Sequence, residues 1–346
     1  MSIPSRCRAM VFDGPGKPLR QAEIPVAWPK AGEAIVQVEL TTLGSDDFGV
    51  IAGKDAAFAP LILGHETVGT ILALGDPPPR EFNGSPLEEG DRIIWSRYVS
   101  CGECFYCRRR LPQECESLRE YGRTSLGDPP RLSGGLAELV HLWPKTAIFK
   151  APKSLAANLA TAIAHAGAKS LAAIDVLIAP VNTALVLGES VEAKLAAAML
   201  RKRGASVDYL DSTCAIHEAD SLSLQSPSER REVDAVLDFY GESFALGFAI
   251  REVRIGGAIS VLQGSSEMAT VDTRELVQKN VRVSGVHRYK PEHLGSALEF
   301  AINHANADRE ILAMLPKTRP LLDVNEAIEE AQKVPSVCIA FEPDQD

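Results

Sequence analysis

The chain has 346 residues, of which 45% are apolar and 24% charged, and its formal net charge is -10. This length allows two domains with cores of their own, and the composition is typical of a soluble globular protein. The acidic balance argues against nucleic acid or an anionic membrane surface as the main partner. Residues 1–20 lack the apolar core of a signal peptide, and no apolar run is long enough to span a bilayer. We therefore expect a cytoplasmic protein.

Residues 1–100 carry a β pattern. Runs at 34–40, with partial alternation, and at 68–75 predict strands, and the chain is expected to return to a strand at 90–94 after the loop between them. Glycine and proline at 13–16 and 29–32 are turn signals, and the prolines between 76 and 86 predict an exposed loop. The first part of the chain is therefore expected to be mostly β.

Four of the seven cysteines lie between positions 101 and 115, with the spacing C-x2-C-x2-C-x7-C: Cys101, Cys104, Cys107 and Cys115. Thiolates bind zinc tetrahedrally at about 2.3 Å, and four of them leave no open position for water or substrate. Clustered C-x2-C steps in a chain without a secretory signal favour a metal over disulfides, which remain the alternative. We expect one structural zinc per chain at this lobe.

The pattern changes from about Ser154. Alanine-rich helical segments now alternate with short apolar strands, which indicates βαβ units and a parallel sheet. The predicted strands of this half are 182–188, 206–211, 233–239, 256–262 and 281–285. A turn and an amphipathic helix are predicted at 287–304, and a final strand at 336–341.

One strand-to-helix turn in this half has features of a dinucleotide site. Such a site needs a tight turn, backbone N–H groups that face the pyrophosphate, and an acid after the next strand for the ribose. Gly188 supplies the turn, and Asp211 stands where the acid belongs, which favours NAD over NADP. The motif reads G-x-S-x-x-A, so the Ser190 hydroxyl would either donate to phosphate or block its approach. We expect Gly188, Ser190, Val191 and Asp211 to bind the cofactor; the alternative is a Rossmann-type fold that binds none.

The cysteine lobe, preceded by Gly64-His65-Glu66 and followed by the βαβ half, resembles the medium-chain, zinc-type alcohol dehydrogenase family over essentially the whole chain. The resemblance implies an α/β plus β fold. A GroES-like β-barrel catalytic domain would comprise 1–153 and 287–346 with the zinc lobe at 101–115 inserted, and a Rossmann doubly wound parallel-sheet domain would comprise 154–286. It also implies a small-molecule substrate, a nicotinamide cofactor, and a homodimer or homotetramer.

Four short stretches resemble a subgroup of this family that is associated with phosphonate catabolism. They are 111–115, 121–122, 132–135 and 291–294. In that subgroup His-Glu follows the tyrosine-glycine pair, whereas this chain has Arg123-Thr124.

The family's catalytic zinc motif is broken in this chain. The resemblance aligns its three protein ligands with Leu43, His65 and Leu159, so leucine stands at two of the three positions. One imidazole with a carboxylate makes a weak site for a divalent metal. Ser45 stands where the family's hydroxyl proton relay begins, but Phe48 occupies the place of a relay histidine.

Three functions remain open on this pattern. The first is an oxidoreductase that transfers hydride between NAD(P) and a small carbonyl, alcohol or activated alkene without a catalytic zinc. Ser45 or His65 would then hydrogen-bond the substrate oxygen, and Glu66 and Asp46 complete the catalytic candidates. The second is a pseudoenzyme that keeps the fold and the structural zinc for a binding or regulatory role. The third is a zinc dehydrogenase with an unusual ligand set of His65, Glu66 and Asp46 or Asp47.

Overall fold

The computed structural model describes residues 3–177, 180–226, 228, 230–264, 267–331 and 338–343. The chain forms two compact units, Met1–His165 with Lys290–Asp346, and Ala166–Tyr289. The predicted domain limits, 153/154 and 286/287, lie 12 and 3 residues before these two changes of unit, and they stay predictions. In the described parts of the chain, no helix is both long and apolar enough to cross a membrane.

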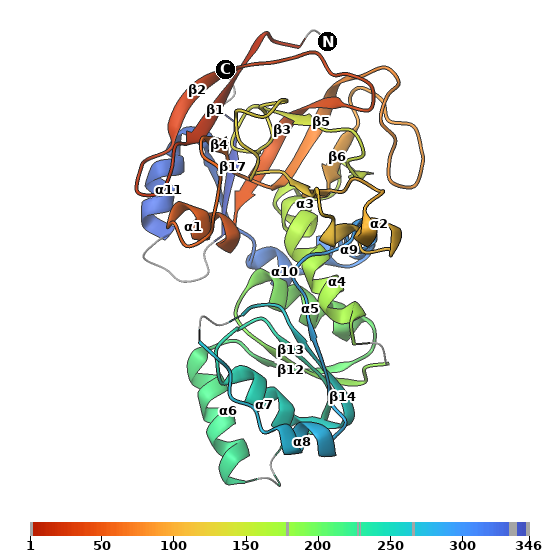
Figure 1. Ribbon diagram of the computed structural model, residues 1–346, viewed down its shortest axis with the longest axis vertical. Helices are drawn as coiled ribbons and strands as arrows, with labels where there is room; N and C mark the ends of the chain where they lie inside the picture. Colours follow the sequence, from red (N-terminus) through yellow and green to blue (C-terminus); the bar gives the residue numbers. More distant parts are fainter. Residues whose placement is uncertain are drawn as a thin grey trace. The chain divides into compact units, whose positions relative to one another are not determined.

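Mostly antiparallel strands build the first unit (Figure 1). One sheet has the order β2 (Arg20–Pro25), β1 (Arg6–Phe12), β4 (Leu61–Ile62). The larger sheet has the order β10 (Ile148–Lys150), β6 (Arg92–Trp95), β5 (Glu66–Leu74), β3 (Ala34–Leu43), β17 (Ile339–Glu342), β16 (Thr318–Pro320), and β3 also pairs with β9 (Leu139–Leu142). A separate ribbon pairs β7 (Tyr98–Val99) with β8 (Arg119–Glu120).

The strands predicted at 34–40, 68–75 and 90–94 are confirmed as β3, β5 and β6. Alternation along β3 places side chains on opposite faces of the sheet. Ile35 therefore lies in one hydrophobic core with Phe341, whereas its neighbour Val36 lies in another with Trp95. The last predicted strand begins at Ile339 as β17, and 336–337 lie outside the described residues.

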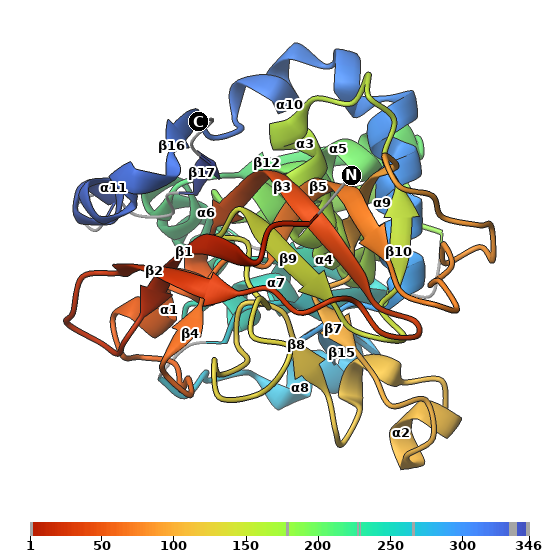
Figure 2. The same cartoon turned by 90° about the horizontal axis from the view of Figure 1, so that it is seen from above.

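The helices of the first unit are short. They are α1 (Ser45–Ile51), α2 (Phe105–Arg108), α3 (Ala157–Ala162), α9 (Pro291–Asn303), α10 (Arg309–Ala313) and α11 (Val324–Ala331), with 3₁₀ turns at Pro112–Glu114, Ala305–Ala307 and Leu321–Asp323. One π-helical turn, Ile163–Gly167, follows α3, and this part of the first unit ends within the turn, at His165. Helix α11 packs beside β17, and α2 lies at the periphery of the unit (Figure 2). The predicted helix at 287–304 is confirmed as α9.

The second unit is a five-stranded sheet in which all pairs are parallel, as predicted. Its order is β12 (Ser206–Leu210), β11 (Thr183–Leu187), β13 (Val233–Asp238), β14 (Val253–Val261), β15 (Arg282–Gly285). Helices α4 (Ala168–Asp175) and α5 (Val191–Lys202) pack together on one face, and the other face carries α6 (Thr213–Gln225), α7 (Ala245–Glu252) and α8 (Thr273–Gln278) (Figure 1). The strand order reverses between β11 and β13, and open parallel sheets bind ligands outside the carboxyl ends of the strands at such a point.

Candidate functional site

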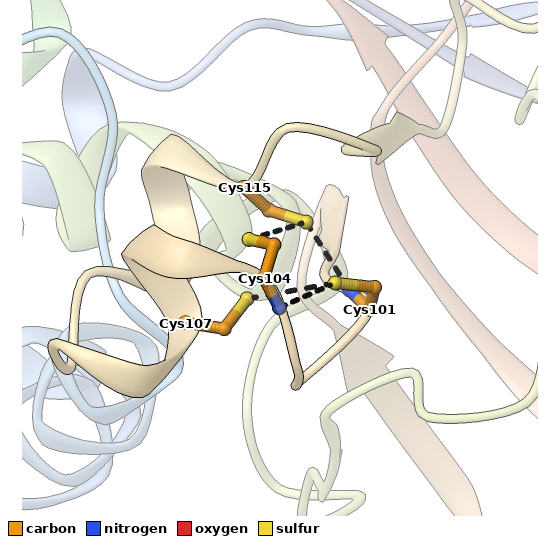
Figure 3. A group of neighbouring side chains, drawn as sticks. All are labelled: Cys101, Cys104, Cys107 and Cys115. Atoms are coloured by element: carbon orange, nitrogen blue, oxygen red, sulfur yellow. Dashed lines mark hydrogen bonds between the residues drawn. The ribbon is translucent and has the colours of Figure 1, made fainter.

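The four clustered cysteines converge on one point (Figure 3). Their sulfur atoms all lie within 4.8 Å of one another. The Cys101 and Cys107 sulfurs are 4.0 Å apart, and those of Cys104 and Cys115 are 3.9 Å apart. Tetrahedral zinc with sulfur at about 2.3 Å places its ligands about 3.8 Å from one another. None of the seven cysteines, all of which are described, forms a disulfide, so the predicted metal cluster has the required geometry.

Backbone N–H groups point at these sulfurs. The Sγ atom of Cys101 accepts hydrogen bonds from the N–H groups of Glu103 (3.4 Å) and Cys104 (3.3 Å). N–H bonds from Cys107 and Glu116 lower the pKa of the Cys104 thiol to about 6. Thiolate is the form that binds metal, so the loop is arranged to hold a cation. Helix α2 of this lobe has no buried residue, so it lacks a hydrophobic core of its own.

The predicted cofactor turn lies within the second unit. Gly188 has φ +120°, and a Cβ atom there would meet the Phe239 backbone at 3.1 Å, so only glycine fits. The Ser190 side chain is the N-cap of α5, because its Oγ accepts a hydrogen bond from the Ala193 N–H at 3.2 Å. A hydroxyl that accepts this bond keeps its own O–H to donate. Val191 is the first residue of the helix.

Asp211 follows β12 directly and is exposed. The strand before it is joined to the glycine turn, since the Gly188 N–H donates to the Leu210 carbonyl at 2.9 Å. Burial raises the pKa of Tyr209, and the charges of Asp211 and of Glu189 in the turn raise it further. Because Asp211 directly follows Leu210 in the chain, the hydrogen bond between Gly188 and Leu210 places Asp211 next to the glycine turn.

A second polar cluster is buried in the first unit, and Arg97 lies at its centre. This residue is between β6 and β7 and is only 5% exposed. Its Nη1 atom donates to Asp46 Oδ2 at 2.6 Å and lies 3.2 Å from Nε2 of His65. Its Nη2 atom is 3.1 Å from Glu120 Oε2. Burial alone would lower the pKa of Arg97, but Tyr98, Asp46 and Glu120 raise it above its ordinary value, so the guanidinium stays charged.

His65 lies between Arg97 and a second ion pair. A guanidinium has no acceptor, so Nε2 of the imidazole must accept the bond from Arg97 and the ring proton resides on Nδ1. That Nδ1 atom is 3.4 Å from Oδ1 of Asp47, which also accepts from Arg123 Nη1 at 2.8 Å. Burial lowers the pKa of His65, and the charge of Arg97 lowers it further. The imidazole is therefore neutral.

His165 brings a second imidazole to the cluster from the π-helical turn. Its Nε2 atom is 3.6 Å from Asp46 Oδ2, and its ring meets that of His65 edge-on with centroids 4.7 Å apart. Single π-helical turns inside helices are frequent at functional sites. The turn thus adds a third potential donor to Asp46 and His65.

The predicted catalytic residues differ in where the structure places them. Asp46 and His65 are in the cluster, and Ser45 is exposed at the first position of α1. The Glu66 carboxylate instead accepts a hydrogen bond from the Thr42 hydroxyl. Leu43 and Leu159, at the positions aligned with family ligands, are fully buried.

The sequence interpretation missed Arg97, Arg123 and His165. Arg97 stands in the run Ile93-Ile94-Trp95-Ser96-Arg97-Tyr98-Val99, where apolar neighbours predict burial and a buried arginine requires a partner. His165 is a single polar residue in a run of alanine, isoleucine and glycine from 162 to 168. Both signals are present in the sequence, but neither identifies the partner.

Three donors of this cluster could in principle hold a metal. The ligand atoms of Asp46, His65 and His165 lie within 4.8 Å of one another, and two imidazoles with a carboxylate are a common zinc donor set. However, Nη1 of Arg97 is already hydrogen-bonded to Asp46 and His65. Because a positive charge occupies two of the three donors, the arrangement does not fit a metal ion.

Comparison with known proteins finds sequence similarity in the first unit. Residues 30–153 match the alcohol dehydrogenase GroES-like domain. Over 116 residues the chain is 34% identical to S-(hydroxymethyl)glutathione dehydrogenase of Escherichia coli O1:K1 / APEC. That match covers 33% of this chain and 30% of the relative, so the chain aligns with less than a third of the length of the curated relatives.

Solved structures match nearly the whole chain. An alcohol dehydrogenase from Thermotoga maritima has a TM-score of 0.85 at 23% identity, covering 98% of this chain and 100% of that one. A protein from Sinorhizobium meliloti 1021, solved with bound NADP, has a TM-score of 0.81 at 20% identity with the same coverage. The predicted fold class is therefore confirmed: a GroES-like domain joined to a Rossmann-type parallel sheet.

Proposed function

Because the chain belongs to the medium-chain, zinc-type alcohol dehydrogenase superfamily, we propose that it is a nicotinamide-dependent oxidoreductase. Its substrate would be a small carbonyl, alcohol or activated alkene, and hydride would pass between that substrate and NAD(P). The observation that carries this proposal is the glycine turn at Gly188, with Asp211 beside it. The closer assignment to the phosphonate-associated subgroup stays a prediction, as do cytoplasmic location and a homodimer or homotetramer.

The turn offers the groups that a dinucleotide needs. A bound nicotinamide cofactor would supply or accept the hydride, which no side chain can do. Gly188 leaves space for the pyrophosphate, and the N-terminus of α5, with the N–H of Val191 and the hydroxyl of Ser190, offers donors and a favourable dipole. Asp211 would accept from the ribose hydroxyls. Its charge opposes a 2′-phosphate, so we propose a preference for NAD(H) even though the Sinorhizobium meliloti relative was solved with NADP.

At the reaction centre Ser45 is the proposed donor to the substrate oxygen. It is exposed on α1 beside the buried cluster, whereas both nitrogens of His65 face residues of their own site. Asp46 and His65 therefore act as positioning residues in this proposal. Glu66, which is hydrogen-bonded to Thr42, is the first residue of β5 and would hold the start of that strand, directly after His65.

The lobe of four cysteines would hold one structural zinc per chain. All four positions of a tetrahedral ion are taken by sulfur. The zinc would then fix the loop around α2 and take no part in the reaction.

Calorimetric titration of the purified protein with NADH and with NADPH tests the function. We expect NADH to bind more tightly, and we expect Asp211→Ser to reduce that preference because it removes the charge that opposes a 2′-phosphate. Glu192→Ser, which removes a carboxylate from the first turn of α5 instead of from the ribose position, is the control and should leave the preference between NADH and NADPH unchanged. Absence of binding by both cofactors would contradict the proposal and favour a pseudoenzyme.

A further inference from the structure

We propose that the guanidinium of Arg97 takes the place of a catalytic metal, so that the reaction centre is organised around an organic cation. The superfamily is zinc-type, and Asp46, His65 and His165 present a metal-like donor set. Yet two of those three residues hold Arg97. That this cluster is the reaction centre rests on the proposed function, whereas the metal-binding test below gives its result whether or not the protein is an oxidoreductase.

The geometry shows that the guanidinium uses the same donors that a metal would need. One atom, Nη1, lies 2.6 Å from Asp46 Oδ2 and 3.2 Å from His65 Nε2. Zinc would need these same two lone pairs at about 2.0–2.2 Å. Arginine cannot be deprotonated in a protein, and its side chain has only hydrogen-bond donors. Arg97 therefore cannot become neutral, and its positive charge would repel a metal ion at the same donors.

The guanidinium is also fixed in place. Its other edge lies 3.1 Å from Glu120 Oε2, and its charge is stacked against the Tyr98 ring at 5.4 Å from the centroid. Arg97 is 5% exposed, and its two Nη atoms contact the carboxylates of Asp46 and Glu120. Moving it aside would break both ion pairs of a buried guanidinium, and the free-energy cost of that step disfavours the movement.

Charge balance points the same way. In a centre of two thiolates and one imidazole, a zinc ion is neutralised by its ligands. Here leucine stands at the two aligned positions, 43 and 159, and the pair of Arg97 with Asp46 is likewise neutral. Without Arg97, the carboxylates of Asp46, Asp47 and Glu120 would outnumber the one remaining guanidinium, that of Arg123, by two, which suits a divalent ion.

Substitution of Arg97 provides the test. We would load the wild type and Arg97→Ala with Co²⁺, dialyse both against metal-free buffer, and measure cobalt per chain and the visible spectrum. The wild type should hold one ion, with the sulfur charge-transfer bands of the cysteine lobe. Arg97→Ala should hold a second ion whose spectrum lacks further sulfur bands, and Arg97→Ala with His65→Gln should lose it again.

Arg123→Ala is the matched control, because this guanidinium belongs to the same cluster but pairs with Asp47 and not with the metal-like donors. Arg123→Ala should bind one Co²⁺ ion per chain, as the wild type does. Arg97→Lys should also bind one ion per chain, since lysine keeps the positive charge at this position. Two ions in the wild type, or one ion in a folded Arg97→Ala, would overturn the inference. If Arg97→Ala fails to fold, the counts for the wild type and Arg97→Lys still decide, because two ions in either contradicts it.

Discussion

The Nη1 atom of Arg97 lies 3.2 Å from Nε2 of His65, and this contact determines which nitrogen of the imidazole carries the proton. Because the guanidinium can only donate, the proton is on Nδ1, toward Asp47. Contacts of polar groups therefore link Arg97 to His65, His65 to Asp47 and Asp47 to Arg123 within the first unit. Substitution of any one of these four residues should therefore lower the free energy of unfolding.

Asp47→Asn should destabilise the protein by about 3–5 kcal/mol, as expected when one partner of a buried ion pair is removed. The Asp47 side chain is 0% exposed, and its loss leaves Arg123 without its 2.8 Å partner. Urea unfolding at neutral pH measures the change. Asp13→Asn is the control: its pair with Arg20 is partly exposed, at 31% and 56%, and should matter by less than about 1 kcal/mol. Equal effects of both substitutions would contradict a buried network.

Stability should fall when the pH drops below about 6.5, the pKa of histidine in an unfolded chain. Burial, with Arg97, holds the pKa of His65 below that value in the folded state. The unfolded state therefore binds a proton that the folded state does not, and the free energy of unfolding decreases as the pH falls toward the folded pKa.

Replacement by a group that does not titrate tests this origin. His65→Gln should make the change in the free energy of unfolding between pH 7 and pH 5.5 smaller than in the wild type. His141 is also buried with a lowered pKa, so His141→Gln should remove a separate part of the slope. If the free energy of unfolding of His65→Gln changes with pH as much as that of the wild type, burial does not hold the imidazole of His65 in its neutral form.

Removal of zinc should expose the cysteine lobe to proteolysis. Helix α2 has no buried residue of its own, and it ends at Arg108, which is followed by Arg109 and Arg110. Trypsin cleaves after arginine, so this run offers three cleavage positions. After treatment with a strong chelator, or in Cys104→Ser, we expect rapid cleavage at 108–110 as read by mass spectrometry of the fragments. Cys214→Ser, a substitution of an exposed cysteine outside the lobe, should leave the cleavage rate as in the wild type. Resistance of the chelated protein would contradict a metal-dependent lobe.

Gly188→Ala should weaken binding of NADH by at least about tenfold. The position has φ +120°, and a Cβ atom would lie 3.1–3.2 Å from Phe239, so the turn must shift away from its present path. Gly204→Ala is a useful comparison, because φ is +93° there too but nothing lies within 4 Å of a new Cβ. Both variants put alanine at a positive φ, so both carry backbone strain. If only Gly188→Ala loses NADH binding, the loss comes from the changed turn at Gly188 and not from strain in general. Equal binding by both would contradict the proposed cofactor site.

The sequence was informative where the chemistry is local. The four cysteines lie within one short loop, and their spacing alone predicts the cluster that the structure shows. Gly188 and Asp211 are also separated by a single strand–helix–strand step, so their proximity follows from the βαβ pattern. The role of Ser190 was open between donation to phosphate and obstruction, and its N-cap bond to Ala193 shows that it first stabilises the helix start.

The buried cluster could not be predicted in the same way because its contacts join distant segments. Arg97 is 32 residues from His65 and 51 from Asp46, and Arg123 is 76 from Asp47. Which loops meet depends on the order of strands in the sheet and on packing against it. The family resemblance aligned Leu43 and Leu159 with two thiolate ligands, but only the fold shows that Arg97 contacts the remaining donors, Asp46 and His65.

X-ray absorption at the zinc edge of the wild-type protein is the most direct test of this account. If Arg97 replaces a catalytic metal, every bound zinc lies in the cysteine lobe, and the spectrum should fit four sulfur atoms at about 2.3 Å and no nitrogen or oxygen. A mixed shell, with nitrogen or oxygen at about 2.0–2.2 Å averaged with sulfur, would mean that Asp46, His65 and His165 bind zinc. That result would contradict the account and restore a zinc-dependent centre.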